Sequence, residues 1–222
     1  MEKYFDVISV SPLFAEMDRE EIGSLLHCLG AKTQTVLRGE PVFLEGDPAG
    51  YVGMVLEGGV QVVQDDFYGS RSLLAHMERG DLFAEAFACA DVKALPISVY
   101  AAEDSVLLLM NCRKMLTVCS KSCRFHNLLV RNLLQVGAAK TLALSSKIRF
   151  MSKKTTREKL MAYLLEQAKR KGQETFSIPL NRQALADYLG VERSAMSAEL
   201  SKMQKEGLLE YKGSQFRLHP VR

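Results

Sequence analysis

Residues 181–203 read Asn-Arg-Gln-Ala-Leu-Ala-Asp-Tyr-Leu-Gly-Val-Glu-Arg-Ser-Ala-Met-Ser-Ala-Glu-Leu-Ser-Lys-Met, and this stretch decides the fold of the C-terminal part of the chain. Asn181 is a favoured helix N-cap, and Gly190 supplies the backbone freedom that a tight turn needs. Apolar residues recur at helical spacing on either side of that glycine. The pattern predicts a helix-turn-helix with Leu185, Ala186, Leu189, Met196, Leu200 and Met203 facing inward and Val191 at the corner.

The outer face of the second predicted helix carries short polar side chains and two cations. Small side chains let a helix lie deep in the major groove of DNA, where base edges are within reach. The start of the first helix is where side chains and backbone N–H groups usually meet phosphate. We therefore predict that double-stranded DNA contacts Arg182, Gln183, Arg193, Ser194, Ser197, Ala198 and Lys202.

Two further features of the C-terminal part agree with a nucleic-acid partner. Residues 207–218 predict a β-hairpin, which would be the wing of a winged helix. Residues 1–146 carry 13 Lys or Arg and 18 Asp or Glu, whereas residues 147–222 carry 16 and 8, giving net charges of −5 and +8. A basic end beside an acidic remainder indicates a polyanionic partner. A winged helix used for protein contacts is the alternative interpretation.

The region from residue 33 to residue 109 reads as short β-strands. Apolar or alternating runs are separated by turn signals such as Arg38-Gly39, Glu57-Gly58-Gly59 and Arg79-Gly80-Asp81, at a spacing typical of an antiparallel barrel or sandwich. The predicted strands include residues 36–37, 42–44, 52–56, 60–63 and 73–75. A helix precedes them, with Asp18 and Glu21 at capping-box spacing and Ile22, Leu25, Leu26 and Leu29 as its apolar stripe.

A long helix is predicted from about residue 122 to residue 150, and it has two apolar stripes. One stripe holds Phe125, Leu129, Leu133 and Val136. The other stripe holds Val130, Leu134, Gly137, Thr141, Leu144 and Ile148. Two stripes need two partners, and a second copy of the same helix is the economical second partner. We therefore expect a homodimer through Val130, Leu134, Gly137, Thr141 and Leu144; a helix buried wholly within one monomer is the alternative.

The whole chain resembles the cyclic-AMP receptor/FNR (CRP/FNR) family of bacterial regulators. The matching motifs are residues 38–47, Arg-Gly-Glu-Pro-Val-Phe-Leu-Glu-Gly-Asp, then residues 55–60 and 80–87 in the first half, and the stretch 181–209 in the second. The resemblance implies an α+β chain with an antiparallel β-roll like the cyclic-nucleotide-binding jelly roll, a dimerisation helix and a winged helix-turn-helix. It divides the chain into an effector domain (1–121), a dimerisation helix (122–151) and a DNA-binding domain (152–222).

The effector cassette departs from the cyclic-nucleotide-binding members of the family. Those members pair the cyclic phosphate with an Arg shortly after the cassette Glu, a contact that a neutral residue cannot replace. Here residues 91–99 contain no Arg, and Lys93 is the only nearby cation. Ala84 also stands where glycine is usual. We expect cyclic AMP to bind weakly or not at all; an effector of another chemistry would contact Glu85, Ser98, Val99, Leu144 and Ser145.

Five cysteines, including Cys119 and Cys123, leave a second question. Cys119, Cys123 and His126 fall on one face of a helix and would suit a metal, haem or thiol sensor, although packing of a small apolar stripe is the alternative. None of the five precedes residue 28, whereas the FNR-type iron–sulfur sensors cluster theirs near the N-terminus.

We find no nucleophile elbow, phosphate loop or metal-protease helix, and we expect a regulator rather than an enzyme. The expected partners are DNA, a second copy of the chain and RNA polymerase, in the cytoplasm and without a membrane. No cofactor is assigned, and the effector, the operator and the sign of regulation stay open. The competing functions are an effector-gated regulator, a constitutive regulator with a vestigial pocket, and a protein-interaction scaffold.

Overall fold

The computed structural model describes residues 2–66, 71–117 and 124–219. The chain divides into two compact units, residues 1–138 and 139–222, with helix α5 (Arg124–Met151) running from the first into the second. The sequence-based division instead set that helix apart as a segment of its own. Each unit has its own hydrophobic core and is described by itself.

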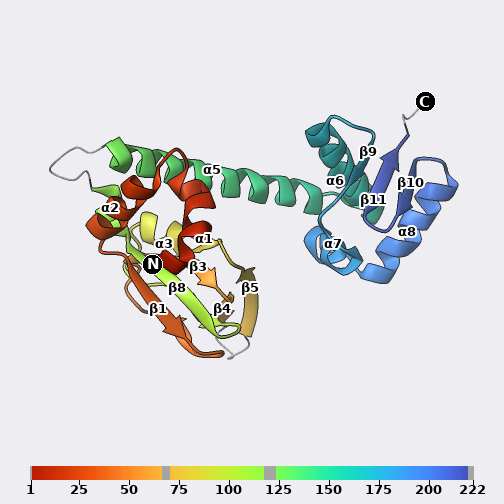
Figure 1. The fold of residues 1–222 in the computed structure, drawn as a ribbon. Helices are drawn as coiled ribbons and strands as arrows, with labels where there is room; N and C mark the ends of the chain where they lie inside the picture. Colours follow the sequence, from red (N-terminus) through yellow and green to blue (C-terminus); the bar gives the residue numbers. More distant parts are fainter. Residues whose placement is uncertain (1, 67–70, 118–123, 220–222) are drawn as a thin grey trace. The chain divides into compact units, whose positions relative to one another are not determined.

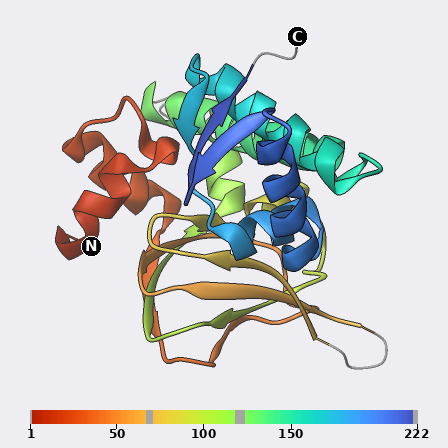
Figure 2. The same ribbon diagram turned by 90° about the vertical axis from the view of Figure 1, so that its right-hand side faces the viewer.

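The first unit consists of short helices and a two-layered β structure. Two four-stranded antiparallel sheets have the strand orders β1-β8-β3-β6 and β2-β7-β4-β5 (Figure 2). The β-roll expected from the sequence is therefore present. The elements are α1 (Phe5–Val10), α2 (Arg19–Leu29), β1 (Lys32–Val36), β2 (Pro41–Phe43), β3 (Tyr51–Glu57), β4 (Val60–Asp65), β5 (Arg71–Met77), β6 (Leu82–Phe83), α3 (Glu85–Cys89), β7 (Ser98–Ala101), β8 (Ser105–Asn111) and α4 (Cys112–Leu116), with 3-10 turns at Glu2–Tyr4 and Pro12–Phe14.

Strand β3 is buried on both faces. Val55 of β3 packs between the two sheets with Val99 of β7. Its neighbours Met54 and Leu56 point to the other side, where they join the cluster formed by α1, α2, α4 and the start of α5. Since successive side chains of a strand point to opposite faces, a strand covered on both sides needs a continuous apolar run. This accounts for the absence of polar side chains from Val52 to Leu56.

Two of the predicted strands end one residue earlier than the sequence suggested. Leu37 and Leu44 lie outside the strands and are exposed, because a turn side chain takes the backbone N–H of each. The Leu37 N–H donates to the Glu40 carboxylate at 2.8 Å, and the Leu44 N–H donates to the Asp47 carboxylate at 2.7 Å. An N–H held by a local side chain is lost to the sheet ladder.

The helices follow their predicted signals closely. Helix α2 begins with a complete capping box, in which Asp18 accepts from the Glu21 N–H and the Glu21 side chain accepts from the Asp18 N–H. On α5 the first stripe packs on the core of the first unit, with Leu129 and Leu133 buried. The second stripe does not: Leu134 and Leu144 are 69% and 59% exposed.

The second unit is a small winged helix. Its elements are α6 (Thr156–Lys171), β9 (Thr175–Ser177), α7 (Arg182–Leu189), α8 (Arg193–Lys205), β10 (Leu209–Lys212) and β11 (Gln215–Leu218). The three strands form an antiparallel sheet in the order β10-β11-β9, and the three helices cover its core (Figure 1). The predicted helix-turn-helix and hairpin are both present.

Among the residues that the structure describes, no helix is both long enough and apolar enough to cross a membrane.

Candidate nucleic-acid interface and effector cassette

The turn between α7 and α8 is built as the sequence predicted. The Asn181 side chain accepts from the Ala184 N–H at 2.9 Å and so caps α7. Gly190 ends α7 in the left-handed conformation, with φ of 60°. Leu185, Ala186 and Leu189 are buried against the apolar stripe of α8, which consists of Met196, Leu200 and Met203. This packing fixes the angle between the two helices and leaves the outer face of α8 to solvent.

The outer face of α8 is largely exposed. Arg193, Ser194, Ala198 and Lys202 are exposed, and Ser197 is half-buried. The Ser197 hydroxyl donates to the Arg193 carbonyl at 2.9 Å, one turn back along the helix. A serine hydroxyl that bonds to the carbonyl of the preceding turn lies close to its own helix and does not project from it. The surface therefore presents two exposed cations beside small side chains.

The start of α8 holds a carboxylate that the sequence reasoning missed. Glu192 is the N-cap, and its side chain accepts from the Ala195 N–H at 2.8 Å and from the Ser194 hydroxyl. These hydrogen bonds, with that from Ser194 first, lower the pKa of Glu192 to about 2. Its position directly before the helix was the available signal, although Ser, Thr, Asp and Asn are the usual caps.

Arg182 and Gln183, the two residues of α7 predicted to contact phosphate, have different surroundings. The Arg182 guanidinium lies against the wing, 4.7 Å from the ring centre of Tyr211 and 5.0 Å from that of Phe216, and it donates to the Gly213 carbonyl at 2.9 Å. Burial in this position lowers its pKa. Gln183 is exposed and donates to Asp187 at 2.9 Å. In this structure Arg182 therefore ties α7 to the wing, and a phosphate contact by it stays a prediction.

A second arginine fixes α8 from the opposite side. Arg157, in the first turn of α6, donates to Glu206 through both Nη atoms at 2.8 and 3.0 Å and to Glu199 through Nε at 2.5 Å. Two parallel N–H···O bonds to one carboxylate define orientation as well as distance. These pairs span 42 and 49 residues, so no local sequence pattern could have revealed them.

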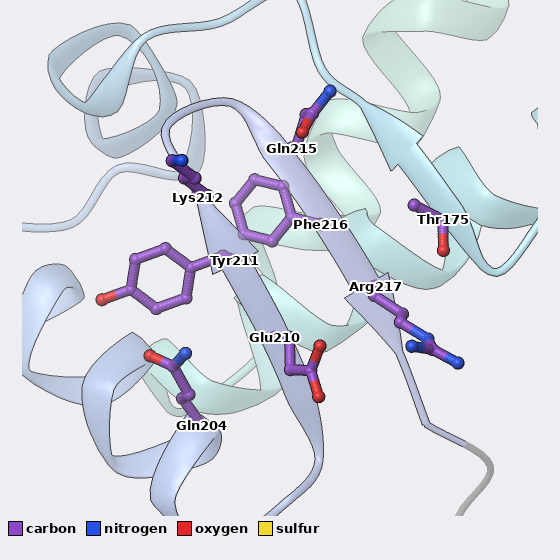
Figure 3. Close-up of a pocket in the computed structure, with 8 residues that line it drawn as sticks. All are labelled: Thr175, Gln204, Glu210, Tyr211, Lys212, Gln215, Phe216 and Arg217. Carbon is purple, nitrogen blue, oxygen red and sulfur yellow. The ribbon is translucent and has the colours of Figure 1, made fainter.

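The wing carries an open hollow of about 390 Å³ beside β10 and β11. Figure 3 shows the Tyr211 and Phe216 rings on these neighbouring strands, and their planes are 30° apart at 6.0 Å. The hollow is lined by Thr175, Gln204, Glu210, Tyr211, Lys212, Gln215, Phe216 and Arg217. Its two cations are Lys212, the last residue of β10, and Arg217 on the central strand β11.

The residues predicted for an effector fall in both units. Glu85 and Ser98 are 8% and 6% exposed, and Val99 is fully buried in the core between the sheets. The Ser98 hydroxyl accepts from the Glu45 N–H at 2.9 Å. Leu144 and Ser145 are exposed on the part of α5 that belongs to the second unit. A common pocket for all five stays a prediction.

The cassette residue Ala84 retains the backbone conformation of the glycine that is usual at this position. Its φ is +61°, in the left-handed region that an alanine adopts only at some cost. Ala84 directly follows β6 and is the N-cap of α3, which begins at Glu85. The turn into α3 is therefore preserved despite the substitution.

The predicted cysteine and histidine stripe is described only at His126. That side chain is 2% exposed, and its Nε2 lies 3.3 Å from the Lys114 carbonyl. Cys119 and Cys123 lie outside the described residues.

Comparison with known proteins places both units in one family. Residues 33–122 match the model of the cyclic nucleotide-binding domain, and residues 158–220 match that of the Crp-like helix-turn-helix domain. The chain belongs to the CRP/FNR family. It is a DNA-binding transcription regulator of the CRP/FNR type.

Individual CRP/FNR relatives match over nearly the whole chain. A Lacticaseibacillus casei protein named "Probable transcriptional regulator flp" is 28% identical over 95% of this chain and 92% of its own. The crystal structure of the Thermus thermophilus catabolite activator protein superposes with a TM-score of 0.50 and 25% identity, covering 94% of each chain. DNR from Pseudomonas aeruginosa, at 19% identity, shares the fold, with a TM-score of 0.52 over 99% of this chain and 95% of its own.

Proposed function

We propose that this CRP/FNR-type regulator binds a pseudo-palindromic DNA site as a homodimer and acts by binding rather than by catalysis. The observation that carries the proposal is the outer face of α8, where Arg193 and Lys202 flank a floor of small side chains on a rigidly packed helix. A helix of this kind fits the major groove, and cations on it add phosphate attraction. Ser194, Ser197 and Ala198 would lie nearest the bases, and Gln183 nearest the backbone.

The homodimer is proposed from α5. Leu134, Gly137, Thr141 and Leu144 are all exposed, whereas Val130 is half-buried. An apolar stripe of this length on a helix surface is usually covered by a partner. Two copies of the chain would bring two recognition helices to successive major grooves, about one helical turn apart. RNA polymerase is the protein partner that we propose for the DNA-bound dimer.

The proposal is tested by selecting bound duplexes from a random pool and measuring their affinity by fluorescence anisotropy. We expect an enriched site with two related half-sites, and an affinity that falls steeply as salt rises, because each neutralised phosphate releases counterions. A scrambled duplex of equal length is the control. An unenriched pool together with a flat salt dependence would instead favour a protein-interaction scaffold.

The effector is proposed to differ from cyclic AMP, or to be absent. Lys93 is exposed, and no arginine occurs in residues 91–99 to pair with a cyclic phosphate. Burying an unpaired anion is costly. Calorimetry with cyclic AMP should therefore show no binding in the micromolar range, and a micromolar dissociation constant would contradict this.

A constitutive regulator with a filled pocket is the second candidate. Val99 packs in the core between the sheets, and the protein's own backbone takes the Ser98 hydroxyl as acceptor. Unfolding and refolding the chain strips small molecules from it. Refolded protein that keeps its DNA affinity would favour the constitutive function, whereas affinity regained only with cell extract would favour gating by an effector.

A further inference from the structure

Two cysteines that are distant in sequence meet in the first unit. Cys89 is the last residue of α3 and Cys112 is the first residue of α4, and their Sγ atoms lie 3.7 Å apart. They are 23 positions apart in the sequence, and β7 and β8 lie between them. The Cys112 N–H donates to the Gly50 carbonyl at 3.0 Å, which fixes the backbone on that side.

The two thiols differ in their surroundings. Cys89 is exposed, whereas Cys112 is 2% exposed. The hydrogen bond between them lowers the pKa of the Cys89 thiol, and both this bond and burial raise the pKa of the Cys112 thiol. A more acidic, accessible thiol beside a neutral, buried one is the arrangement of an attacking cysteine and its resolving partner.

The pair also lies at the edge of an open groove. Cys112 lines this groove of about 640 Å³ together with Lys93 and Arg113. Cys89 does not line the groove but is exposed, so small polar oxidants can reach it from solvent. A disulfide bond is roughly 2.05 Å long, so the two sulfurs must come closer by side-chain rotation. Cys89 is exposed and is the last residue of α3, so we expect its side chain to make that rotation.

We propose that Cys89 and Cys112 form a reversible, oxidant-reactive thiol pair that closes to an intramolecular disulfide. The oxidant is hydrogen peroxide. The Cys89 thiolate attacks the peroxide, its sulfur bonds to one oxygen as the O–O bond breaks, and the other oxygen leaves as hydroxide and takes a proton to become water. The Cys112 thiol then attacks the Cys89 sulfenic acid, forming the S–S bond and releasing a second water.

Reduction by a dithiol returns both thiols and completes the cycle. This chemistry does not depend on the proposed DNA-binding function, because the pair lies within the first unit. A metal ion held by the same sulfurs is the competing possibility. Within the described ranges no three His, Cys, Asp or Glu side chains cluster as metal ligands, and the Cys89–Cys112 contact supplies only two sulfurs.

Tryptic digestion separates all the cysteines and so tests the pair directly. Cleavage after Arg79, Lys93 and Arg113 places Cys89 in the peptide 80–93 and Cys112 in the peptide 94–113. The reduced full-length chain is treated with stoichiometric hydrogen peroxide, alkylated, digested and analysed by mass spectrometry. We expect the 80–93 and 94–113 peptides to be joined as the main product, and dithiothreitol to separate them.

Three single variants divide the possible outcomes. Cys112→Ser should leave Cys89 as a sulfenic acid that dimedone traps, and Cys89→Ser should abolish the linked peptide. Cys28→Ser, which alters another exposed cysteine, should change nothing. Thermal unfolding of each variant checks that the buried Cys112→Ser still folds. A disulfide that joins peptide 80–93 to a different cysteine would overturn the proposal. So would one equivalent of metal bound by the unaltered chain and lost in Cys89→Ser.

Discussion

Arg193 and Lys202 stand at opposite ends of the outer face of α8, and we expect them to contribute differently to DNA binding. Arg193, in the first turn, is placed to reach a base edge, so Arg193→Ala should cost about 1–3 kcal/mol at one position of each half-site and relax the base preference there. Lys202, two turns on, should contact the backbone. Lys202→Ala should weaken all sequences about equally and reduce the salt slope.

Selection of bound sequences with each variant measures this difference. The two variants serve as controls for each other, since each removes one positive charge from the same exposed face. If Arg193→Ala enriched the same site as the unaltered chain, Arg193 would not read bases.

Gly53 is a residue whose role the sequence alone does not reveal. It lies on β3 directly against the Phe83 ring, and an added Cβ would lie 2.1 Å from the nearest ring carbon. Phe83 is 1% exposed in the core between the sheets and has no free space to move into. Gly53→Ala should therefore destabilise the chain by about 1–3 kcal/mol through overpacking.

Gly23 offers a matched control of opposite sign. It is exposed on α2, and a Cβ there would meet nothing within 4 Å. Gly23→Ala should stabilise by about 0.5–1 kcal/mol, because glycine is a poor helix former. Urea denaturation of both variants checks the pair of predictions. Equal changes in stability for the two substitutions would show that the contact between Gly53 and Phe83 does not restrict the side chain at position 53.

At the scale of elements, α8 is held by α6 through the Arg157 ion pairs. Arg157 lowers the pKa of Glu206 below its ordinary value of 4.5. A carboxylate with a depressed pKa contributes stability above its unfolded pKa, and this contribution is lost as the pH falls through the folded pKa. Local protection of α8 should therefore fall as the pH drops below about 4.5, and Arg157→Gln should lack much of this dependence.

Hydrogen exchange of the amides in α8, measured by mass spectrometry against pH, makes this loss visible. Arg170→Gln is the control, since it removes an exposed arginine of the same helix that pairs with Glu166 instead. An unchanged α8 profile in Arg157→Gln would mean that the apolar stripe alone holds the recognition helix.

Elements that depend on local signals could be predicted from the sequence, and those that depend on distant contacts could not. The period of Leu185, Leu189, Met196 and Leu200 predicted both recognition-motif helices, because burial of one face imposes that spacing. The short helices α3 and α4 have no such period, since each spans only five residues.

The candidate site shows the same limit. The outer face of α8 could be predicted, because exposure follows from the helical period once the buried stripe is known. The stacking of Arg182 on Tyr211 could not, since it depends on how α7 docks against the wing hairpin. The approach of Cys89 to Cys112 could not be predicted either. The chain between these two residues passes through β7 of one sheet and β8 of the other, so their distance depends on how both sheets pair.

At the scale of the whole molecule, the exposed stripe of α5 is the feature that would unite two copies. Leu134 lies on that stripe and is 69% exposed. Leu142 is 68% exposed on the same helix but lies about 120° around it from the centre of the stripe. These two leucines are thus matched in type and exposure and differ in the face that they occupy.

Leu134→Glu should convert the chain to a monomer at micromolar concentration, because a carboxylate at the centre of an apolar interface would be buried without a partner. Leu142→Glu should leave the dimer intact. Light scattering measures the mass, and anisotropy compares a duplex with two half-sites one helical turn apart with a duplex carrying one. The unaltered chain and Leu142→Glu should bind the double site far more tightly, whereas Leu134→Glu should bind both duplexes alike. A Leu134→Glu dimer, or an unaltered chain that bound one half-site as tightly as two, would mean that α5 does not join two DNA-binding units.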